Sequence, residues 1–393
     1  MTSIPTSTKA WIVANYPRGL PTFTTADDSN ATFKLVERPL PPLGPDQVLL
    51  KTLYLSNDPA QRTFIEPTIP QERMYAPRTQ LNNFMLALGL GEVIASTSES
   101  LPKGTIVVTF QEAWAEYVVV NAADCQARGP LPNGLSITHY LGAFGGPGLT
   151  AYYGLVNVGE TKKGMRVVVS GAAGAVGNMV VQIAKNIIGC SQVIGIAGTD
   201  EKCRWVESLG ADVCVNYRSS TFEQDLIKAT DGFVDVFFDN VGVSQSQALQ
   251  LKSIPLLKSQ LDIASLLCWD DVLITDPVIL LQGHILDLML SRLKPRGVAV
   301  ACGSISMYNS QEPTVLKNYF QVITMRLSIR GFLFMDYASN TQEILDLFAR
   351  TVQEGKLKVT NEQVVDTKFE DIPKVWLKLF EGENTGKLVT KLV

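Results

Sequence analysis

Six short apolar segments between residues 165 and 334 alternate with segments of helical periodicity. The helical segments carry apolar residues three and four apart, which is typical of a helix with one buried face. Runs of this length that alternate with helices predict a doubly wound, parallel, six-stranded sheet of the α/β class. The predicted strands are 165–171, 191–198, 212–217, 233–242, 297–304 and 327–334, and the helices between them are 175–189, 200–210, 222–231, 284–294 and 315–325.

The first 125 residues follow a different sequence pattern. Short β-type runs such as KAWIVAN, QVLLKTLYL and AEYVVV are separated by clusters of Pro and Gly, which predicts an antiparallel, barrel-like domain. The tail after residue 355 returns to strand-like and short helical pieces. We therefore expect one domain over 1–130, completed by 358–393, and a second domain over 131–357.

The turn after the first strand of the alternation is the strongest motif in the chain. The strand ends at Ser170, and Gly171, Gly174 and Gly177 follow before the helix begins. Small residues there let the backbone approach a pyrophosphate, and the helix N-terminus offers N–H groups and a positive dipole end. The motif predicts a dinucleotide site, and the alternative is a tight turn that binds nothing.

The second strand leaves the choice of nicotinamide coenzyme open. Acidic residues at its end would suit the ribose diol of NAD, and Asp200 and Glu201 are both present. Lys202, with Arg204 as a second cation, would suit the 2′-phosphate of NADP.

The composition argues against several classes of partner and site. The net charge of −4 gives no global attraction to nucleic acid or anionic lipid. Six cysteines without a C-x-x-C pair and only two histidines argue against a metal site. The chain shows no apolar run of membrane-spanning length and no signal peptide at its start. We expect a reduced, cytoplasmic protein with no membrane or nucleic-acid partner.

Ten segments carry a resemblance to a known family. The chain resembles the medium-chain dehydrogenase/reductase superfamily, and within it the zinc-free, NADPH-dependent alkenal/one double-bond reductases, which include prostaglandin reductases (leukotriene B4 12-hydroxydehydrogenases) and curcumin reductase. The resemblance spans nearly the whole chain outside 243–282. It rests on LSNDPAQR, HYLGAFGGPGLTAYYGL, VVVSGAAGAVGNMVVQIAK, GIAGTDEKCRW, NYR, DNVG, ILDLMLSRLKPRG, CGSISMYN, IRGFL and GENTGKLV.

The resemblance implies a GroES-like, β-barrel-type catalytic domain followed by a Rossmann domain, with NADPH as coenzyme and no metal. Zinc alcohol dehydrogenases carry a Cys where this chain has the run 56–59, Ser-Asn-Asp-Pro. Relatives are often dimers joined edge to edge, so a homodimer is an expected assembly. The residues that the family would place on the coenzyme are Gly174, Ala175, Val176, Gly177, Lys202, Tyr217, Asn240, Cys302, Gly303, Ser304, Phe332, Leu333 and Asn384.

Tyr308 is the residue that the family places beside the reacting carbonyl. The implied reaction is hydride transfer to the β-carbon of an α,β-unsaturated aldehyde or ketone, with the enolate oxygen stabilised by the Tyr308 hydroxyl. Without the resemblance, Tyr308 would be read as a packing residue of a loop. Two alternatives are a quinone reductase of the same fold and a catalytically silent NADPH-binding protein. Departures from relatives at Gly146 and in 84–91 leave the substrate open.

Residues 243–282 interrupt the family pattern between DNVG and GHILD. Joining Gly242 to Gly283 restores that pattern. Val243-Ser244 can be encoded by a 5′ splice site (GTGAGT or GTAAGT), Thr275-Asp276 by a branch point and Gln282 by the 3′ CAG. We therefore interpret the segment as a translated retained intron. The alternatives are a lid and an interaction loop.

Deleting 243–282 should raise stability or activity. Loops that connect a strand to the next helix usually take about 2–6 residues, and this one leaves the end of a central strand where a coenzyme would bind. The measurement is NADPH consumption with a simple enone for the full chain and for the shortened chain. Amplification of the mature transcript tests the intron directly, and retention in every transcript would refute it.

Overall fold

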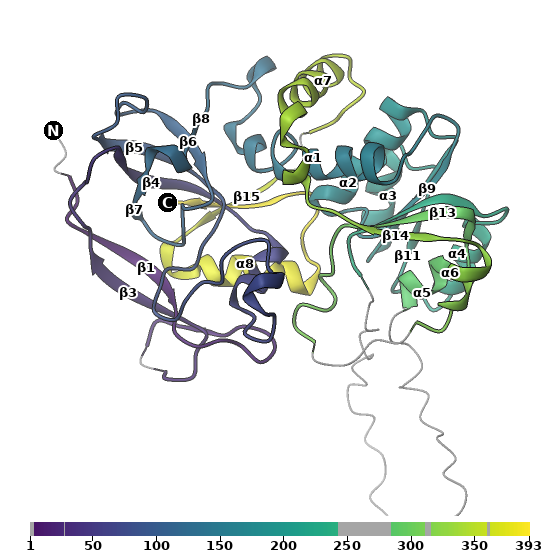
Figure 1. Ribbon diagram of the computed structural model, residues 1–393, viewed down its shortest axis with the longest axis horizontal. Coiled ribbons are helices and arrows are strands. Elements are labelled where there is room, and N and C mark those ends of the chain that lie inside the picture. Colours follow the sequence, from purple (N-terminus) through teal and green to yellow (C-terminus); the bar gives the residue numbers. More distant parts are fainter. Residues whose placement is uncertain (1–3, 27, 243–283, 311–315, 360–361) are drawn as a thin grey trace, which may run out of the picture.

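The computed structural model describes residues 4–26, 28–242, 284–310, 316–359 and 362–393. Two parts lie side by side in Figure 1, one rich in sheet and one built of a sheet covered by helices. The segment 243–282 lies outside the described residues, so the intron interpretation stays a prediction.

The second part is built on a six-stranded parallel sheet. Its strand order is β11-β10-β9-β12-β13-β14, and every neighbouring pair is parallel. This order corresponds to 3-2-1-4-5-6 and reverses between β9 and β12, where a dinucleotide crevice forms in such folds. The predicted doubly wound sheet is confirmed. The strands are β9 (Arg166–Val169), β10 (Gln192–Ala197), β11 (Val213–Asn216), β12 (Val234–Asp239), β13 (Leu293–Ala301) and β14 (Ser328–Gly331).

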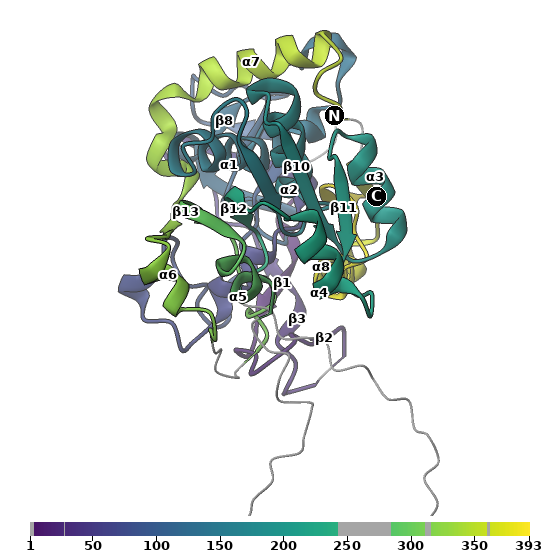
Figure 2. The ribbon, with the colours of Figure 1, turned by 90° about the vertical axis from the view of Figure 1, so that its right-hand side faces the viewer.

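Helices cover both faces of this sheet, as Figures 1 and 2 show. The side chains of β9 alternate between the faces. Val167 and Val169 belong to the core under α1, α2, α3 and α7, whereas Val168 belongs to the core under α4, α5 and α6. The helices are α1 (Gly146–Tyr153), α2 (Ala175–Gln182), α3 (Asp200–Ser208), α4 (Phe222–Ala229), α5 (His284–Leu290), α6 (Phe320–Thr324) and α7 (Thr341–Gln353).

Several helices differ from the prediction. The helix predicted over 284–294 ends at Leu290, and strand β13 begins at Leu293. The segment predicted as a helix over 175–189 is α-helical to Gln182 and then forms a π-helical segment, Ile183–Ile188, that ends on left-handed Gly189. The helix predicted over 315–325 begins only at Phe320. Just before it, Asn318 is fixed by Asp287, which accepts from its backbone N–H (2.7 Å) and its side-chain amide (3.0 Å). Helix α7 was not predicted, although its apolar residues at 344, 345 and 348 follow helical spacing.

The first part combines a seven-stranded sheet with a small three-stranded one. Its larger sheet has the order β15-β16-β4-β5-β6-β8, with β7 also paired to β4, and the smaller has the order β1-β3-β2. The strands are β1 (Ser7–Val13), β2 (Phe23–Thr24), β3 (Phe33–Pro39), β4 (Gln47–Ser56), β5 (Gly89–Ser96), β6 (Ile106–Thr109), β7 (Tyr117–Asn121), β8 (Gln126–Ala127), β15 (Gln363–Thr367) and β16 (Leu388–Leu392).

The tail returns to this first part. Strand β16 pairs antiparallel with β4, and helix α8 (Ile372–Glu381) buries Trp376 against Trp114 and Phe33. Figure 1 shows β15 and α8, in yellow, among the purple and blue strands of the N-terminal region. The arrangement agrees with the predicted GroES-like part plus Rossmann part. The exact domain boundaries, 130/131 and 357/358, remain a prediction.

One carboxylate is buried inside the first part. Glu112 is 0% exposed, and neither of its carboxylate oxygens has a hydrogen-bond partner among the described residues. The nearby Thr52 hydroxyl donates to the carbonyl of Ala115 instead. Gly89 and Gly91 make room for the Glu112 side chain, because a Cβ at Gly91 would lie 2.8 Å from its oxygens. Burial raises the pKa of Glu112 to about 7.

Glu112 should therefore make stability fall as pH rises. An unfolded glutamate loses its proton near pH 4.5, while the folded one keeps it to about pH 7. Over that window the folded state binds the extra proton, and the free energy of unfolding falls by roughly 3 kcal/mol. Denaturant titrations of wild type and Glu112→Gln between pH 4.5 and 8 measure this, and the difference between them should carry the slope. Glu99→Gln, at an exposed position, is the control. Parallel curves for wild type and Glu112→Gln would contradict the prediction.

Candidate functional site

The glycine loop after β9 has the shape of a phosphate cradle. Gly171 adopts a left-handed conformation with φ of 57°, and Gly174 caps helix α2 in an extended one. A Cβ at Gly177 would overlap the carbonyl oxygen of Gly171 and lie 2.8 Å from the Cα of Ala172. The loop and the helix can pack this closely only without that side chain. Helix α2 begins at the half-buried Ala175 directly after this loop, and the N-terminus of a helix suits an anion.

Asp239 fixes the neighbouring strand end. Its buried carboxylate accepts hydrogen bonds from the Ser170 hydroxyl (2.7 Å) and from the backbone N–H groups of Val241 and Gly242 (3.1 Å each). Burial raises the pKa of Asp239 despite these donors. Asn240 is held in turn by its side-chain amide, which donates to the carbonyl of Ser170 (2.8 Å). The predicted site residue Asn240 is thus held by Ser170, whose hydroxyl donates to the buried Asp239. The sequence did not single out this aspartate.

The residues predicted to bind the 2′-phosphate lie just after β10 and β11. The Tyr217 ring lies over Gly198, where a Cβ would be 2.9 Å from the Tyr217 hydroxyl. Arg218 lies 5.7 Å from the Tyr217 ring centroid, and its charge contributes to a lowered pKa at Lys202, for which burial is the larger cause. Arg204, the predicted second cation, is exposed on α3, whereas Arg218 lies near enough for its charge to act on Lys202. The signal was available, because Arg218 completes the NYR motif.

The acidic residue Asp200 has a different partner from the one an NAD site needs. Its carboxylate accepts a hydrogen bond from the side chain of Asn216 at the end of β11, at 2.8 Å. This contact holds the first turn of α3 against β11. Of the acids and cations that the sequence left open, the geometry favours the cations as coenzyme contacts.

The tail approaches the same loop. The Gly386 N–H donates to the carbonyl of Ala173 (2.8 Å), and the Asn384 side chain donates to the carbonyl of Gly386 (3.1 Å). Asn384 therefore lies beside the glycine loop, on a segment that leads into strand β16 of the first part.

The loop after β13 contains Cys302 to Tyr308. The backbone N–H groups of Cys302 and Gly303 donate to the carbonyl of Asp239 (2.9 and 3.1 Å). Burial raises the pKa of Cys302 to about 12, so its thiol stays protonated. A Cβ at Gly242 would meet the Cα of Ser304 at 2.9 Å. These contacts place Cys302, Gly303 and Ser304 at the carboxyl edge of the sheet next to Asn240.

Tyr308 is fixed within this loop and between the two parts. Its hydroxyl accepts a weak hydrogen bond from the Ser304 N–H at 3.4 Å, and burial raises its pKa. The next residue, Asn309, accepts from the buried Arg62 guanidinium at 2.9 Å. Arg62, which also pairs with Glu66 at 3.0 Å, ends the LSNDPAQR motif of the first part. Sequence reasoning missed Arg62 as an anchor, because its partner lies 247 residues away.

Two further aromatic residues have distinct roles. The Phe332 ring packs against Phe238, 6.5 Å between centroids, over Gly154. Its half-buried side chain therefore packs against the core of the six-stranded sheet. Tyr75 lies near Tyr308. Its side chain is 46% exposed, and its ring packs edge-on against Phe64 with 6.0 Å between the ring centroids.

An ion pair occupies the loop where zinc alcohol dehydrogenases carry a Cys. The Lys387 ammonium is 4% exposed and lies 2.6 Å from the Asp58 carboxylate and 2.9 Å from the carbonyl of Asn57. The Ser56 hydroxyl also donates to Asp58. Across the residues that the structure describes, no group of three or more His, Cys, Asp or Glu could hold a metal ion. The loop is instead tied to the tail.

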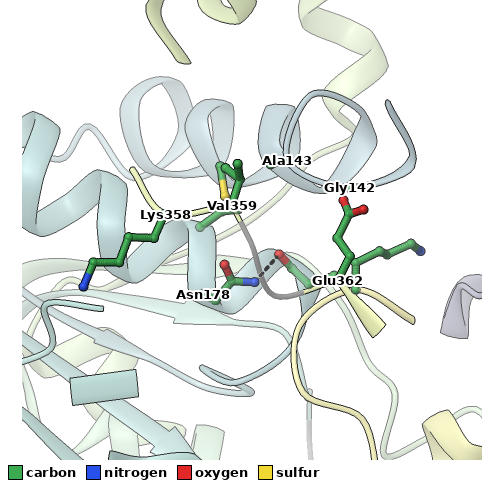
Figure 3. A pocket seen from close by; sticks show the side chains of 9 residues that line it. Gly142, Ala143, Asn178, Lys358, Val359 and Glu362 are labelled. Atoms are coloured by element: carbon green, nitrogen blue, oxygen red, sulfur yellow. Dashed lines mark hydrogen bonds between the residues drawn. The ribbon is translucent and has the colours of Figure 1, made fainter. Parts of the chain in front are cut away.

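A small cavity lies beside the first turn of α2, between this helix and the tail of the chain (Figure 3). It measures about 20 Å³, which suits one water molecule rather than a substrate. The buried Glu362 lines it, and its carboxylate lies 2.7 Å from Nδ1 of His139. Asn178 closes the helix turn by donating to the carbonyl of Ala175 at 2.9 Å. Neither Lys202 nor Tyr308 lines this cavity, so we assign it to packing of the tail on α2.

Comparisons with known proteins agree with this geometry. Residues 9–127 match the family described as the N-terminal domain of oxidoreductase, and 175–254 match the family described as zinc-binding dehydrogenase. The chain is 30% identical to bovine prostaglandin reductase 1, with 98% of each chain covered. It is 32% identical to the Saccharomyces cerevisiae "Uncharacterized membrane protein YML131W", again with 98% of each covered.

A solved structure gives the same result. CurA of Vibrio vulnificus, in complex with NADPH, superposes with a TM-score of 0.78 at 27% identity, covering 98% of this chain and 99% of that one. Within the described ranges of this chain, no helix has both the length and the apolar character needed to cross a membrane.

Gly177 should be the least replaceable glycine of the cradle. Gly177→Ala places a methyl group against two backbone atoms that cannot rotate away, so we expect a loss of about 3 kcal/mol or more in unfolding free energy. Gly174→Ala is the matched control, because a Cβ there meets only the carbonyl of Gly171, at 3.2 Å, and φ is −81°. Thermal unfolding of both variants measures the contrast. Equal midpoints would show that the close packing of loop and helix is not the constraint.

Proposed function

This chain belongs to the zinc-independent branch of the medium-chain dehydrogenase/reductase superfamily that contains prostaglandin reductase 1, and we propose that it reduces conjugated carbon–carbon double bonds. It is an oxidoreductase of that family, and its coenzyme is NADPH. The proposed substrates are α,β-unsaturated aldehydes and ketones. The specific substrate class and the role of Tyr308 are our proposal.

The residues predicted to bind the coenzyme offer backbone N–H groups and positive charges that suit NADPH. The cradle of Gly174, Ala175, Val176 and Gly177 would hold the pyrophosphate, and Lys202 with Arg218 would hold the 2′-phosphate beside Tyr217. Asn240, the 302–304 backbone, the Phe332–Leu333 backbone and Asn384 would surround the nicotinamide half. When bound, NADPH supplies the hydride for the reaction.

The position and protonation state of the Tyr308 hydroxyl are the observations that support the proposed reaction. Hydride addition at the β-carbon moves negative charge onto the carbonyl oxygen, and a donor aimed at that oxygen lowers the barrier. The raised pKa of Tyr308 keeps its hydroxyl protonated over the ordinary pH range. Because the hydroxyl oxygen accepts from Ser304, its own proton remains available to the substrate carbonyl. Arg62 fixes the loop from the opposite part, so the donor stands where the two parts meet.

A homodimer and a cytoplasmic location complete the proposal. Strand β14 is the outer strand of the six-stranded sheet, and Ile329 on it is 43% exposed. The preceding helix exposes Phe320 (67%) and Ile323 (64%). An apolar edge of this kind supports pairing with a second copy. Sedimentation velocity measures the assembly.

Cell fractionation tests the proposed cytoplasmic location. Recovery in the membrane fraction, which the name of the yeast relative suggests, would contradict it.

Tyr308→Phe should remove most of the activity while leaving the coenzyme site intact. We expect kcat/KM for a simple enone to fall by about 10²-fold or more, because one oxyanion donor is lost. NADPH binding, followed by coenzyme fluorescence, should be unchanged. Tyr117→Phe, on β7 of the first part, is the control for loss of a tyrosine hydroxyl and should keep full activity. Full activity in Tyr308→Phe would refute the assigned role.

The substrate panel tests the reaction class. Turnover of enals and enones, with saturated product, is the expected result. Turnover of quinones alone would replace the proposal with a quinone reductase. NADPH binding without turnover of any of these would indicate a silent coenzyme-binding protein.

A further inference from the structure

Lys202 has two partners that a coenzyme-binding lysine does not need. Its ammonium donates to the backbone carbonyls of Gly382 (2.7 Å) and Asn384 (2.6 Å). Both carbonyls belong to the tail, about 180 residues further along the chain. An ammonium has three N–H donors, so these contacts use two of them. The third is left for another acceptor.

The tail turn that Lys202 holds is short and has further contacts with the coenzyme part. Gly382, with φ of 67°, ends helix α8, and strand β16 begins at Leu388. Between them, Gly386 donates to the carbonyl of Ala173 in the glycine loop. The turn 382–386 therefore attaches the first part of the chain to the coenzyme part through Lys202 and Ala173, and Arg218 adds a longer hydrogen bond to the carbonyl of Glu381 at 3.5 Å.

The charges at this place favour an incoming anion. Lys202 and Arg218 are both cationic, and the guanidinium of Arg218 lies near Gly382, where a Cβ would be 3.5 Å from it. The acceptors that hold Lys202 are neutral carbonyls, and the nearby carboxylates of Glu201 and Glu383 act on it less than burial and Arg218 do, since the pKa of Lys202 is lowered. A dianionic phosphate beside the two cations would favour the charged ammonium and strengthen its hydrogen bonds.

We propose that Lys202 binds the 2′-phosphate and the tail turn 382–386 with the same ammonium, so that the 2′-phosphate tightens the attachment of the tail to the coenzyme part. This inference rests on NADPH as the coenzyme. It assigns to the 2′-phosphate a role beyond affinity, because the same turn carries Asn384 toward the nicotinamide half. The coupling is reciprocal, since a better-held turn must also bind the phosphate more tightly.

Hydrogen–deuterium exchange of the tail turn tests the coupling without any turnover. The probes are adenosine 2′,5′-bisphosphate and adenosine 5′-monophosphate, each at a saturating concentration set by calorimetry. We expect the bisphosphate to slow exchange of the amides in 382–386 by roughly 5-fold or more, the lower end of typical coupling effects. The monophosphate, which lacks the 2′-phosphate, should leave their exchange near that of the free protein.

Variants separate the two roles of the lysine. Lys202→Met should speed exchange of 382–386 in the free protein and abolish the response to bisphosphate. Arg204→Met, which removes an exposed cation from the same helix, should behave as wild type. Unchanged exchange in free Lys202→Met, or wild-type protein that binds bisphosphate with no slowing at 382–386, would overturn the inference. Wild-type protein that fails to bind bisphosphate would overturn the coenzyme assignment as well.

Discussion

The site depends on one buried aspartate at the point where the strand order reverses. Asp239 accepts three hydrogen bonds through its carboxylate, from Ser170 and from the two residues that begin the next turn. Its backbone carbonyl accepts two more from Cys302 and Gly303. Burying a carboxylate costs free energy, and the donors around it offset that cost. Through this residue the ends of β9, β12 and β13 are held together, and the predicted nicotinamide-side residues take their positions from those ends.

The two parts of the chain build the site jointly. The coenzyme part supplies the glycine cradle, the cations and the Tyr308 loop. The other part holds that loop through Arg62 and returns the tail past the cradle through Lys387 and Gly386. Polar contacts of this kind across an interface set geometry as well as stability, because each leaves a buried group unsatisfied when the surfaces slide. The loop that carries Tyr308 is therefore held by Arg62, from the N-terminal part of the sequence.

Local patterns predicted much of this structure. The apolar runs that became β9 to β14 are continuous because both faces of a parallel sheet are covered, and the glycine spacing marked the turn into α2. Resemblance then pointed to Lys202, Asn240 and Tyr308. What could not be predicted depends on distance along the chain. The contacts of Arg62 with Asn309, of Lys202 with Gly382 and of Glu362 with His139 join residues whose proximity no local spacing encodes. The short α6 was mispredicted because a long-range contact, Asp287 with Asn318, overrides local propensity.

The position of β16 in the sequence has a consequence for how the protein is made. Strand β16 pairs with β4 and with β15, yet more than 300 residues, including the whole parallel sheet, are synthesised between β4 and β16. During translation the N-terminal sheet must therefore wait with Tyr54, Leu55 and Ser56 of β4 unpaired on the side that β16 later takes, because β7 covers only the earlier part of that side. Unpaired strand edges bind other strands, and closing so long a loop is slow. The nascent chain thus passes through a stage at which chaperone protection would favour correct completion of the sheet over aggregation.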